Sequence, residues 1–274
     1  MEKAFLTDSE FEKIVQIIRD ASGIHLSDSK RDLVVNRILK RYKSLGLSSF
    51  SAYMDYLESG GVKEMSSLVD AITTNLTYFF REVHHFEYLE RTLLPEFYAT
   101  RTDDVFRIYS AGCSSGEEVV SCAIVCERFK QKNEDFSYEI VAVDIDTKMI
   151  KFANDGVYSE ESLMLVSDSD RRLVFDRGTG GNRGFYRVKP DVKKNIRFLQ
   201  QSIMERPKVM LDYDLIFCRN VLIYFSEESA LKVLSAFRSV LKKDGLLFLG
   251  HSENMVGKQD FFELITRTMY RASQ

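Results

Sequence analysis

Long hydrophobic runs are missing from this sequence, in which no apolar stretch approaches the roughly 18 to 20 residues that would span a bilayer. The first residues, MEKAFLTDSEFEK, also lack the basic and then apolar pattern of a secretory signal. We therefore expect a cytoplasmic protein with no direct membrane insertion.

Cysteine is sparse, and its spacing excludes two classes of small structural framework. Cys113, Cys122, Cys126 and Cys218 match neither a zinc site nor a secreted disulfide scaffold. We expect these four side chains to be buried, reduced thiols.

An excess of charge of one sign is also missing, because 38 basic residues face 41 acidic ones and the net charge of -3 says little about partners. Apolar residues make up 45% of the chain and charged residues 29%, which is typical of a soluble globular protein and not of a disordered one. The 274 residues are many for one domain and suit two unequal ones.

Residues 1 to about 82 are predicted to be helical only. In DSEFEKIVQIIRDASG, Phe11, Ile14 and Ile18 recur at helical intervals, and Gly23 is the predicted end of the helix. The segments SDSKRDLVVNRILKRYKSLGL, SSFSAYMDYLES and KEMSSLVDAITTNL predict three further helices. The first of these three has an apolar stripe and, opposite it, a cationic face formed by Lys30, Arg31, Arg37, Lys40, Arg41 and Lys43.

The pattern changes after Pro95. The short apolar runs VFRIYSAG, YEIVAVDID, YDLIFCRN and GLLFLGHS alternate with helical segments, which predicts an α/β fold with a mainly parallel, doubly wound sheet. Between the second and third runs, RRLVFDRGTGGNRGFYRVKPDVKKNIRFL predicts an inserted antiparallel hairpin with a third strand, over about residues 170–200.

The turn after the first strand has the composition of a ligand site. Gly112 and Gly116 would let a ligand approach the backbone where an open α/β sheet binds ligands. The next helix opens with Glu117 and Glu118, which repel phosphate and argue against a dinucleotide. These carboxylates suit a cationic group such as the ammonium or sulfonium of S-adenosylmethionine, and Asp144 could bind ribose hydroxyls. The alternative is that both glutamates only favour the helix N-terminus.

The segment FCRNVLIYF ends a later strand and places Arg219, Asn220 and Tyr224 at the same edge of the sheet. An amine methyltransferase would carry Asn-Pro-Pro-Tyr at such a position. Here Val221 and Leu222 replace both prolines, which argues against amine chemistry. The alternative is an ordinary strand-to-helix turn with a partly buried tyrosine.

The order and spacing of six motifs resemble the chemotaxis receptor methyltransferases, the CheR family. The motifs are TTNLTYFFREVHHF, SAGCSSGEE, VDIDTKMI, RGTGGNRG, FCRNVLIYF and GLLFLGHSEN, and they cover nearly the whole chain. The sequence departs from the family where Val119 and Val120 replace a usual Pro-Tyr pair and where Ser202 replaces an asparagine that often contacts the cofactor.

The resemblance implies a class I methyltransferase-like fold with an N-terminal helical receptor-contact domain, residues 1–82, and an S-adenosylmethionine-dependent catalytic domain, residues 83–274. The implied reaction transfers the methyl group of S-adenosylmethionine to glutamate side chains of membrane chemoreceptors, giving the methyl esters of chemotactic adaptation. A glutamate with a pKa of roughly 4.3 is already an anion at pH 7, so the attacking oxygen needs no general base.

The resemblance also assigns roles to residues. Arg81 would lie in the catalytic cleft, where its fork of donors could orient the incoming carboxylate or stabilise a cofactor group, and Tyr224 would donate a hydrogen bond near the reacting centre. Glu118 would meet the ammonium of the cofactor, with Glu117 as its close rival, and Asp144 would meet the ribose. The residues implied to bind the cofactor are Asn75, Thr77, Arg81, Glu118, Asp144, Ser202, Ile203, Arg219 and Asn220.

The implied partners are the cytoplasmic domains of chemoreceptors, with the protein itself a monomer. The cationic helix could meet acidic receptor helices; a solvated face is the alternative, and nucleic acid is disfavoured because aromatic residues are not interleaved there. The hairpin resembles the part of the family that captures a short peptide at a receptor C-terminus. Its docking residues would be Arg177, Gly178, Gly180, Gly184 and Arg187, and the alternative is a flexible glycine turn without a ligand.

In NLTYFFREVHHF we expect Tyr78, Phe79 and Phe80 to pack at the junction between the domains. Neighbouring residues on a helix point about 100° apart, so we expect His84 and His85 to share no metal. Two other functions remain open. One is a non-catalytic adaptor that binds S-adenosylmethionine and the receptor, and the other is a small-molecule or nucleic-acid methyltransferase on the same scaffold.

Overall fold

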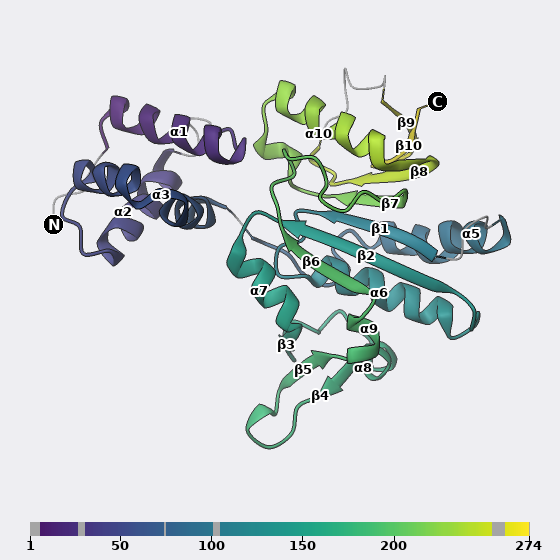
Figure 1. The fold of residues 1–274 in the computed structure, drawn as a ribbon. Helices are drawn as coiled ribbons and strands as arrows, with labels where there is room; N and C mark the ends of the chain where they lie inside the picture. Colours follow the sequence, from purple (N-terminus) through teal and green to yellow (C-terminus); the bar gives the residue numbers. More distant parts are fainter. Residues whose placement is uncertain (1–5, 27–30, 74, 101–104, 254–260, 274) are drawn as a thin grey trace.

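The computed structural model describes residues 6–26, 31–73, 75–100, 105–253 and 261–273, apart from the side chains of residues 60–62. Three parts are visible in Figure 1: a helical unit at the N-terminus, a large sheet covered by helices, and a small sheet below it. None of the helices in the described ranges combines the length and the apolar character needed to cross a bilayer.

The helical unit consists of α1 (Asp8–Ser22), α2 (Arg31–Ser44) and α3 (Phe50–Ile72). A reciprocal pair of hydrogen bonds between Thr7 and Glu10 caps the start of α1, and Gly23 ends it with a φ of 75°, as predicted. Val34 and Ile38 on α2 are fully buried in the core of this unit.

Helix α3 corrects the prediction of two separate helices, because it runs without a break through Gly60 and Gly61. Both of its halves bury large side chains in the same core, Tyr53 and Leu57 in the first half and Leu68 in the second. Burying each large apolar side chain stabilises by roughly 1.5–3 kcal/mol. That gain exceeds the cost of about 1 kcal/mol for each glycine inside a helix.

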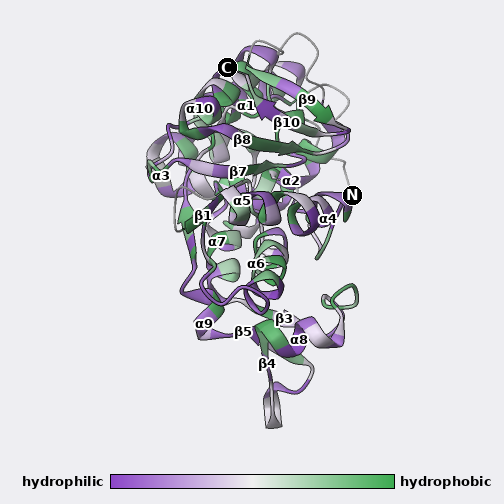
Figure 2. Ribbon diagram, turned by 90° about the vertical axis from the view of Figure 1, so that its right-hand side faces the viewer, coloured by the Kyte–Doolittle hydropathy of each residue, from purple (hydrophilic) through white to green (hydrophobic). Residues whose placement is uncertain are grey.

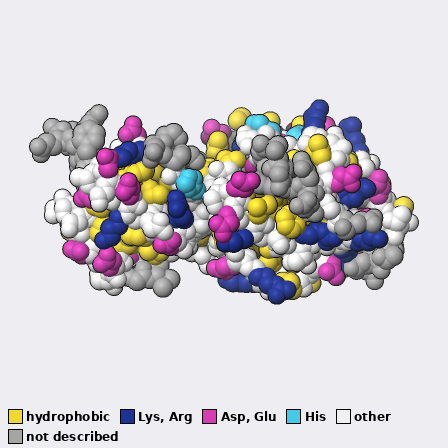
Figure 3. Space-filling view, turned by 90° about the horizontal axis from the view of Figure 1, so that it is seen from above, with side chains coloured by type: hydrophobic (Ala, Val, Ile, Leu, Met, Phe, Trp, Pro, Cys, Tyr) yellow, Lys and Arg dark blue, Asp and Glu magenta, His cyan; other side chains and the backbone are white. Residues whose placement is uncertain are grey.

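The cationic face of α2 is largely used inside the helical unit. Arg31 contacts Asp8 at 2.7 Å, and Arg41 holds the buried carboxylate of Glu64 with two bonds of 2.9 and 2.6 Å. Arg37 donates to the carbonyl groups at the end of α3. Figure 3 shows basic, acidic and apolar side chains interspersed on this part of the molecule. The exposed basic residues of α2 are Lys40 and Lys43, and Lys30 lies outside the described residues.

The large sheet has seven strands in the order β6-β2-β1-β7-β8-β10-β9. The first five in this order are parallel, and the last two form an antiparallel hairpin at one edge. This arrangement confirms the predicted mainly parallel, doubly wound fold; the C-terminal hairpin was not predicted. The strands are β1 (Val105–Ala111), β2 (Ser137–Asp144), β6 (Ile196–Gln200), β7 (Tyr213–Cys218), β8 (Leu241–Leu249), β9 (Phe262–Thr266) and β10 (Met269–Ala272).

Helices cover both faces of this sheet, and its central strands are mostly hydrophobic in Figure 2. One apolar core forms around α6, and a second forms on the other side around α10. All four cysteines are buried and reduced in these cores, as predicted. The helical segments are α4 (His84–Tyr88), the π-helix η2 (Leu89–Leu93), α5 (Leu94–Thr100), α6 (Glu117–Lys130), α7 (Thr147–Asp155), the 3-10 helix η4 (Leu222–Tyr224) and α10 (Glu227–Val240).

The small antiparallel sheet is present as predicted, in the order β3-β5-β4, but its bounds differ from the predicted 170–200. It begins earlier, at β3, whose three residues are too short to show an alternating pattern. The end of the predicted range is β6, which pairs with β2 in the large sheet. Its elements are β3 (Val157–Ser159), α8 (Asp168–Val174), β4 (Phe175–Arg177), the 3-10 helix η3 (Gly180–Asn182), β5 (Phe185–Val188) and α9 (Pro190–Lys193).

Candidate active site

A cavity of about 390 Å³ lies where β1, β2 and β7 end, between the large sheet and the helical unit. Its wall includes the end of α1, the linker after α3 and the turns that follow the three strands. The predicted site residues on this wall are Asn75, Thr77, Arg81, Glu118, Asp144, Ser202, Ile203, Arg219, Asn220 and Tyr224. The structure therefore brings all of the predicted cofactor and catalytic residues together around one space, and their individual roles stay predictions.

The turn after β1 passes very close to the turn after β7. Gly112 has a φ of 80°, and a Cβ atom there would lie 2.5 Å from the side chain of Val221. Only glycine can adopt this positive φ without strain and also leave room for the side chain of Val221. Two residues later, the backbone N–H of Ser114 donates to Asp144 at 2.8 Å. The first two strand ends are thus joined at the floor of the cavity.

Asp144 is buried and oriented by backbone donors. One carboxylate oxygen accepts from Ser114, and the other accepts from the N–H of Asp146 at 2.9 Å. Burial raises the pKa of Asp144, and these N–H donors act in the opposite direction. Each oxygen has a second lone pair, so the group can still accept from two neighbouring hydroxyls such as those of a ribose.

Glu118, and not its rival Glu117, lines the cavity. It accepts from the hydroxyl of Ser110 at 2.8 Å and from Nη1 of Arg219 at 3.0 Å. Glu117 instead accepts from Ser115 at 2.6 Å. Burial raises the pKa of Glu118, and the Arg219 charge opposes that shift.

Arg219 connects the cavity floor to the linker, because it contacts both Glu118 and the backbone of Arg81. Its Nη2 donates to the backbone carbonyl of Arg81, its Nε lies 3.6 Å from Glu82, and its guanidinium lies 5.7 Å from the ring centre of Phe86. The side chain of Arg81 is half-buried and donates to the carbonyl of Leu76 at 2.8 Å. One end of its guanidinium is therefore held by the linker that forms the cavity wall.

The turn after β7 is held by a carboxylate that sequence reasoning missed. Glu253 is buried and accepts from the backbone N–H groups of Asn220, Val221 and Leu222 at 2.7–2.9 Å and from that of Gly250. The acid in GHSE, just past a strand end, was the available signal. Asn220 adopts a φ of 61°, and its buried Oδ1 has no hydrogen-bond partner among the described residues.

Two predicted cofactor residues already have local partners. The amide of Asn75 donates to Asp146 at 2.8 Å, and its backbone carbonyl accepts from Ser114 at 3.4 Å. The hydroxyl of Ser202 accepts from the N–H of Met204 at 3.2 Å, which leaves its own O–H available to donate.

The aromatic residues of the linker do not all pack as predicted. Phe79 is fully buried, with its ring edge-on to Tyr158 and Phe175 of the small sheet at 5.0 and 6.1 Å. Phe80 is half-buried against Phe86. Tyr78 is 46% exposed, so it is not a packing residue at a junction. Of the three aromatic residues, Phe79 therefore packs on the small sheet and Phe80 packs on α4.

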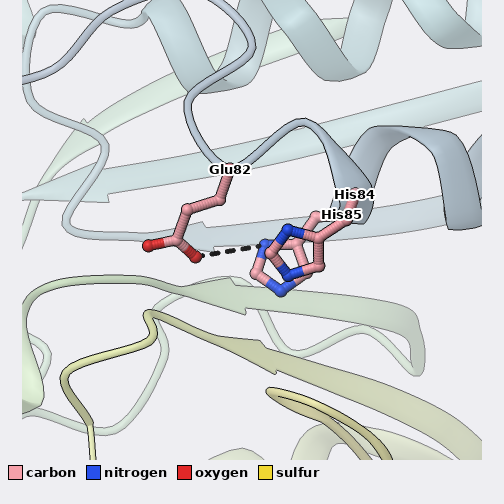
Figure 4. Close-up of side chains that lie close together, drawn as sticks. All are labelled: Glu82, His84 and His85. Atoms are coloured by element: carbon pink, nitrogen blue, oxygen red, sulfur yellow. Dashed lines mark ion pairs between the residues drawn. The ribbon is translucent and has the colours of Figure 1, made fainter.

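Glu82, His84 and His85 converge, contrary to the expectation that the two histidines point apart. The histidine rings lie 4.2 Å apart, and the donor atoms of the three side chains lie within 4.8 Å of one another (Figure 4). The positive φ of Glu82 (56°) turns the chain immediately before α4, which begins at His84. The guanidinium of Arg219, 3.6 Å from Glu82, would repel a metal ion here.

His85 is a buried neutral histidine. Its Nε2 lies 2.8 Å from the hydroxyl of Thr268, and its ring stacks on Phe248 at 4.9 Å. Burial, followed by the charges of Arg219 and His84, lowers its pKa from 6.5 to about 2. The unfolded chain therefore takes up a proton below pH 6.5 that the folded chain refuses.

This difference predicts an acid-sensitive stability. As the pH falls from 6.5 to about 4.5, His85 should lower the free energy of unfolding by up to about 1.4 kcal/mol for each pH unit. This slope should fade above pH 6.5 and be negligible above roughly pH 7.5. Urea unfolding of His85→Phe should show a flatter profile in this range. Phe248→Leu, which loosens the same stack but removes no titrating group, should be less stable at every pH with the wild-type slope. Identical slopes in wild type and His85→Phe would contradict the prediction.

The cavity fits S-adenosylmethionine by the chemistry of its wall. Asp144 can accept from ribose hydroxyls, Glu118 offers a carboxylate to a cation, and the orphaned Oδ1 of Asn220 needs a donor. A parallel sheet with an acid at the end of its second strand and a ligand cavity over its carboxyl edge is common to α/β folds that bind nucleotides. Because Glu118 in the first turn of α6 would repel a pyrophosphate, the site favours the class of S-adenosylmethionine-binding α/β methyltransferases over that of dinucleotide-binding enzymes.

Two family models match nearly the whole chain. Residues 75–271 match the family model "CheR methyltransferase, SAM binding domain", and residues 9–73 match "CheR methyltransferase, all-alpha domain". The chain belongs to the CheR methyltransferase family, and its cofactor is S-adenosylmethionine. The two matches meet between residues 73 and 75; the boundary expected after residue 82 stays a prediction.

Relatives support this membership over the full length of the chain. A "Chemotaxis protein methyltransferase" of Escherichia coli is 37% identical over 275 residues, covering 100% of this chain and 94% of that protein. One from Borreliella burgdorferi is 33% identical, with 96% and 94% covered. Among solved structures, the [4+2]-cyclase SpnF has a TM-score of 0.33 at 15% identity, covering 60% of this chain and 44% of that one.

Proposed function

We propose that this protein transfers the methyl group of S-adenosylmethionine to glutamate side chains in the cytoplasmic domains of chemoreceptors, and that the resulting methyl esters serve chemotactic adaptation. The observation that carries the proposal is the single cavity lined by Glu118, Asp144 and Arg219 together with Arg81 and Tyr224. The relatives described above, which are named chemotaxis protein methyltransferases, support the same assignment.

The reaction requires little acid–base catalysis by the protein. An oxygen of the ionised glutamate attacks the methyl carbon, the C–O bond forms as the C–S bond breaks, and sulfur keeps the electron pair. With an ordinary pKa of roughly 4.3, the glutamate is deprotonated at pH 7. What the protein must supply is alignment and exclusion of water, which effective-molarity arguments value at several kcal/mol.

In this scheme Arg81 orients the incoming carboxylate. Its guanidinium is half-buried on the cavity wall and fixed at one nitrogen by the carbonyl of Leu76, so its remaining donors face a defined direction. Tyr224 lies on the same wall, at the end of η4, and would donate from its hydroxyl near the reacting centre. Glu118 and Asp144 would hold the ammonium and the ribose of the cofactor.

The test is incubation with methyl-labelled cofactor and receptor cytoplasmic fragments. We expect base-labile label on receptor glutamates, and fragments with glutamine at those positions serve as the control. Absence of such label while a known family enzyme is active would defeat the proposal. Tight cofactor binding without turnover would instead favour the non-catalytic adaptor.

We also propose that the small sheet binds the C-terminal segment of a receptor. β4 is an edge strand, and the docking residues lie on β4, on β5 and in the loop between them. The loop shape depends on Gly178, where a Cβ atom would lie 2.1 Å from the carbonyl oxygen of Asn182. Main-chain pairing along an edge strand needs such a fixed register.

Gly178→Ala should therefore weaken binding of a receptor C-terminal peptide, with a loss of about tenfold or more, or roughly 1.4 kcal/mol. Gly181→Ala is the matched control, because no atom lies within 4 Å of the added methyl group and no positive φ is required there. Calorimetry with the peptide measures both variants. Equal affinity in Gly178→Ala and wild type would place the tether elsewhere.

A further inference from the structure

The loop that follows α1 reaches across to the turn that carries Tyr224. Ile24 and Phe225 form an isolated antiparallel bridge, and the backbone N–H of His25 donates to the carbonyl of Tyr224 at 2.6 Å. Ile24 and Leu26 also line the cavity. A segment of the helical unit is thus hydrogen-bonded to the backbone of a predicted catalytic residue.

The two sides of this contact belong to different cores. Tyr224 packs against the core of the helical unit, and its neighbour Phe225 packs against the core on the α10 side of the sheet. The carboxylate of Glu253 accepts from the backbone of the 221–225 turn, and the N–H of His25 donates to a carbonyl of the same turn. Its position therefore depends on the helical unit as well as on the sheet.

Gly23 makes the close approach possible. It adopts a φ of 75°, and a Cβ atom there would lie 2.8 Å from Cγ of Met204 and 3.0 Å from Cε1 of Phe225. A larger residue would push the loop away from the turn or displace the ring of Phe225 beside Tyr224.

A second attachment lies on the opposite side of the cavity. Asn75 donates to Asp146 at 2.8 Å, and the hydroxyl of Thr147 donates to Asp70 on α3 at 3.3 Å. The helical unit is fastened near the ends of both β2 and β7. Loosening one attachment would shift one wall of the cavity while the other stays in place.

We propose that the Gly23–Leu26 loop is a positioning element for Tyr224, so that the helical unit completes the active site in addition to any contact it makes with a receptor. The proposal rests on the proposed function in so far as Tyr224 acts in methyl transfer. If the loop were only a packing contact, changes at Gly23 would alter stability and nothing else.

Gly23→Ala tests this, with Gly46→Ala as its control. Gly46 has nearly the same φ, 74°, but no atom lies within 4 Å of an added methyl group, so it carries the backbone strain without the collision. Gly23→Ala should lower kcat for methyl transfer on the order of 10-fold to 100-fold, as expected for a displaced catalytic group. The KM for receptor and the Kd for S-adenosylhomocysteine should change less than about threefold, and Gly46→Ala should keep the wild-type kcat.

Removing the colliding side chain should restore activity. Gly23→Ala combined with Met204→Ala should regain most of the lost kcat, because the closest contact is then relieved while the strain at residue 23 remains. The double variant also lacks this collision while it folds, so its activity can be measured even if Gly23→Ala alone does not fold. A double variant that folds and still lacks activity would overturn the proposal.

Hydrogen exchange gives a readout that does not depend on activity. The amide of His25 should lose protection in Gly23→Ala and keep it in Gly46→Ala. Wild-type kcat together with wild-type protection in Gly23→Ala would overturn the positioning role. If the wild-type protein methylates no receptor, the proposed function fails, and the exchange measurement alone decides the positioning role.

Discussion

Arg81→Ala is expected to lower kcat for receptor methylation by about 10²-fold to 10³-fold, the usual loss when one fixed donor of an active site is removed. The residue lies on the cavity wall, and its guanidinium is held by the carbonyl of Leu76 at 2.8 Å. Without it, the incoming carboxylate would bind in several orientations, of which few place an oxygen in line with the methyl group. Single-turnover assays with labelled cofactor measure the effect.

The fold should be nearly unaffected by this change, because the Arg81 side chain is only half-buried and its hydrogen bond from the charged guanidinium to the carbonyl of Leu76 is exposed to solvent. We expect a free energy of unfolding within about 1 kcal/mol of wild type. Arg81→Lys is the matched variant: it keeps the charge but loses the planar fork, and it should recover only part of the activity. Full turnover in Arg81→Ala would remove Arg81 from its assigned role.

Arg219→Ala is expected to destabilise the protein by about 3–5 kcal/mol, as is usual when one partner of a buried ion pair is removed. The change would leave the Glu118 carboxylate buried with Ser110 as its remaining side-chain donor, and it would remove the donor to the Arg81 carbonyl. Urea unfolding measures the loss. A loss below about 1 kcal/mol would show that the pair is solvated or not formed.

A double variant separates stability from cofactor binding. Glu118→Gln combined with Arg219→Met removes both charges and keeps similar volumes, so most of the stability should return. Affinity for S-adenosylhomocysteine, measured by calorimetry, should be lower than in wild type, because neither charge of the pair is present to meet the amino-acid end of the cofactor. Recovery of both properties would show that the pair serves the fold alone.

The parts of the fold that the sequence predicted are those with continuous or strictly periodic apolar patterns. β1, β2, β7 and β8 are buried on both faces, so they read as apolar runs. β9 has one buried residue followed by four exposed ones, and it was missed. α3 was divided at its paired glycines because the packing that carries the helix through them is a tertiary effect.

In the candidate site, too, local patterns predicted single residues, whereas the contacts between them required the fold. Strand-end motifs and the family resemblance pointed to Glu118 and Arg219, but their ion pair joins residues 101 positions apart and required the fold. The role of Glu253 rests on four backbone donors from two turns, which no local pattern reveals. The choice between Glu117 and Glu118 likewise depended on which side chain faces the cavity.

The buried ring of Phe79 joins the small sheet to the linker that carries Arg81. It packs edge-on against both Tyr158 and Phe175 of the small sheet, which also contact each other, and it stands two positions before Arg81 in the chain. The backbone N–H of Val188 donates to the carbonyl of Gly156, so the two ends of segment 157–187 lie close together, as in an insertion that could be replaced as a unit. A chimera that replaces this segment would therefore have to supply matching aromatic partners for Phe79, because the linker that carries Arg81 would otherwise lose its support.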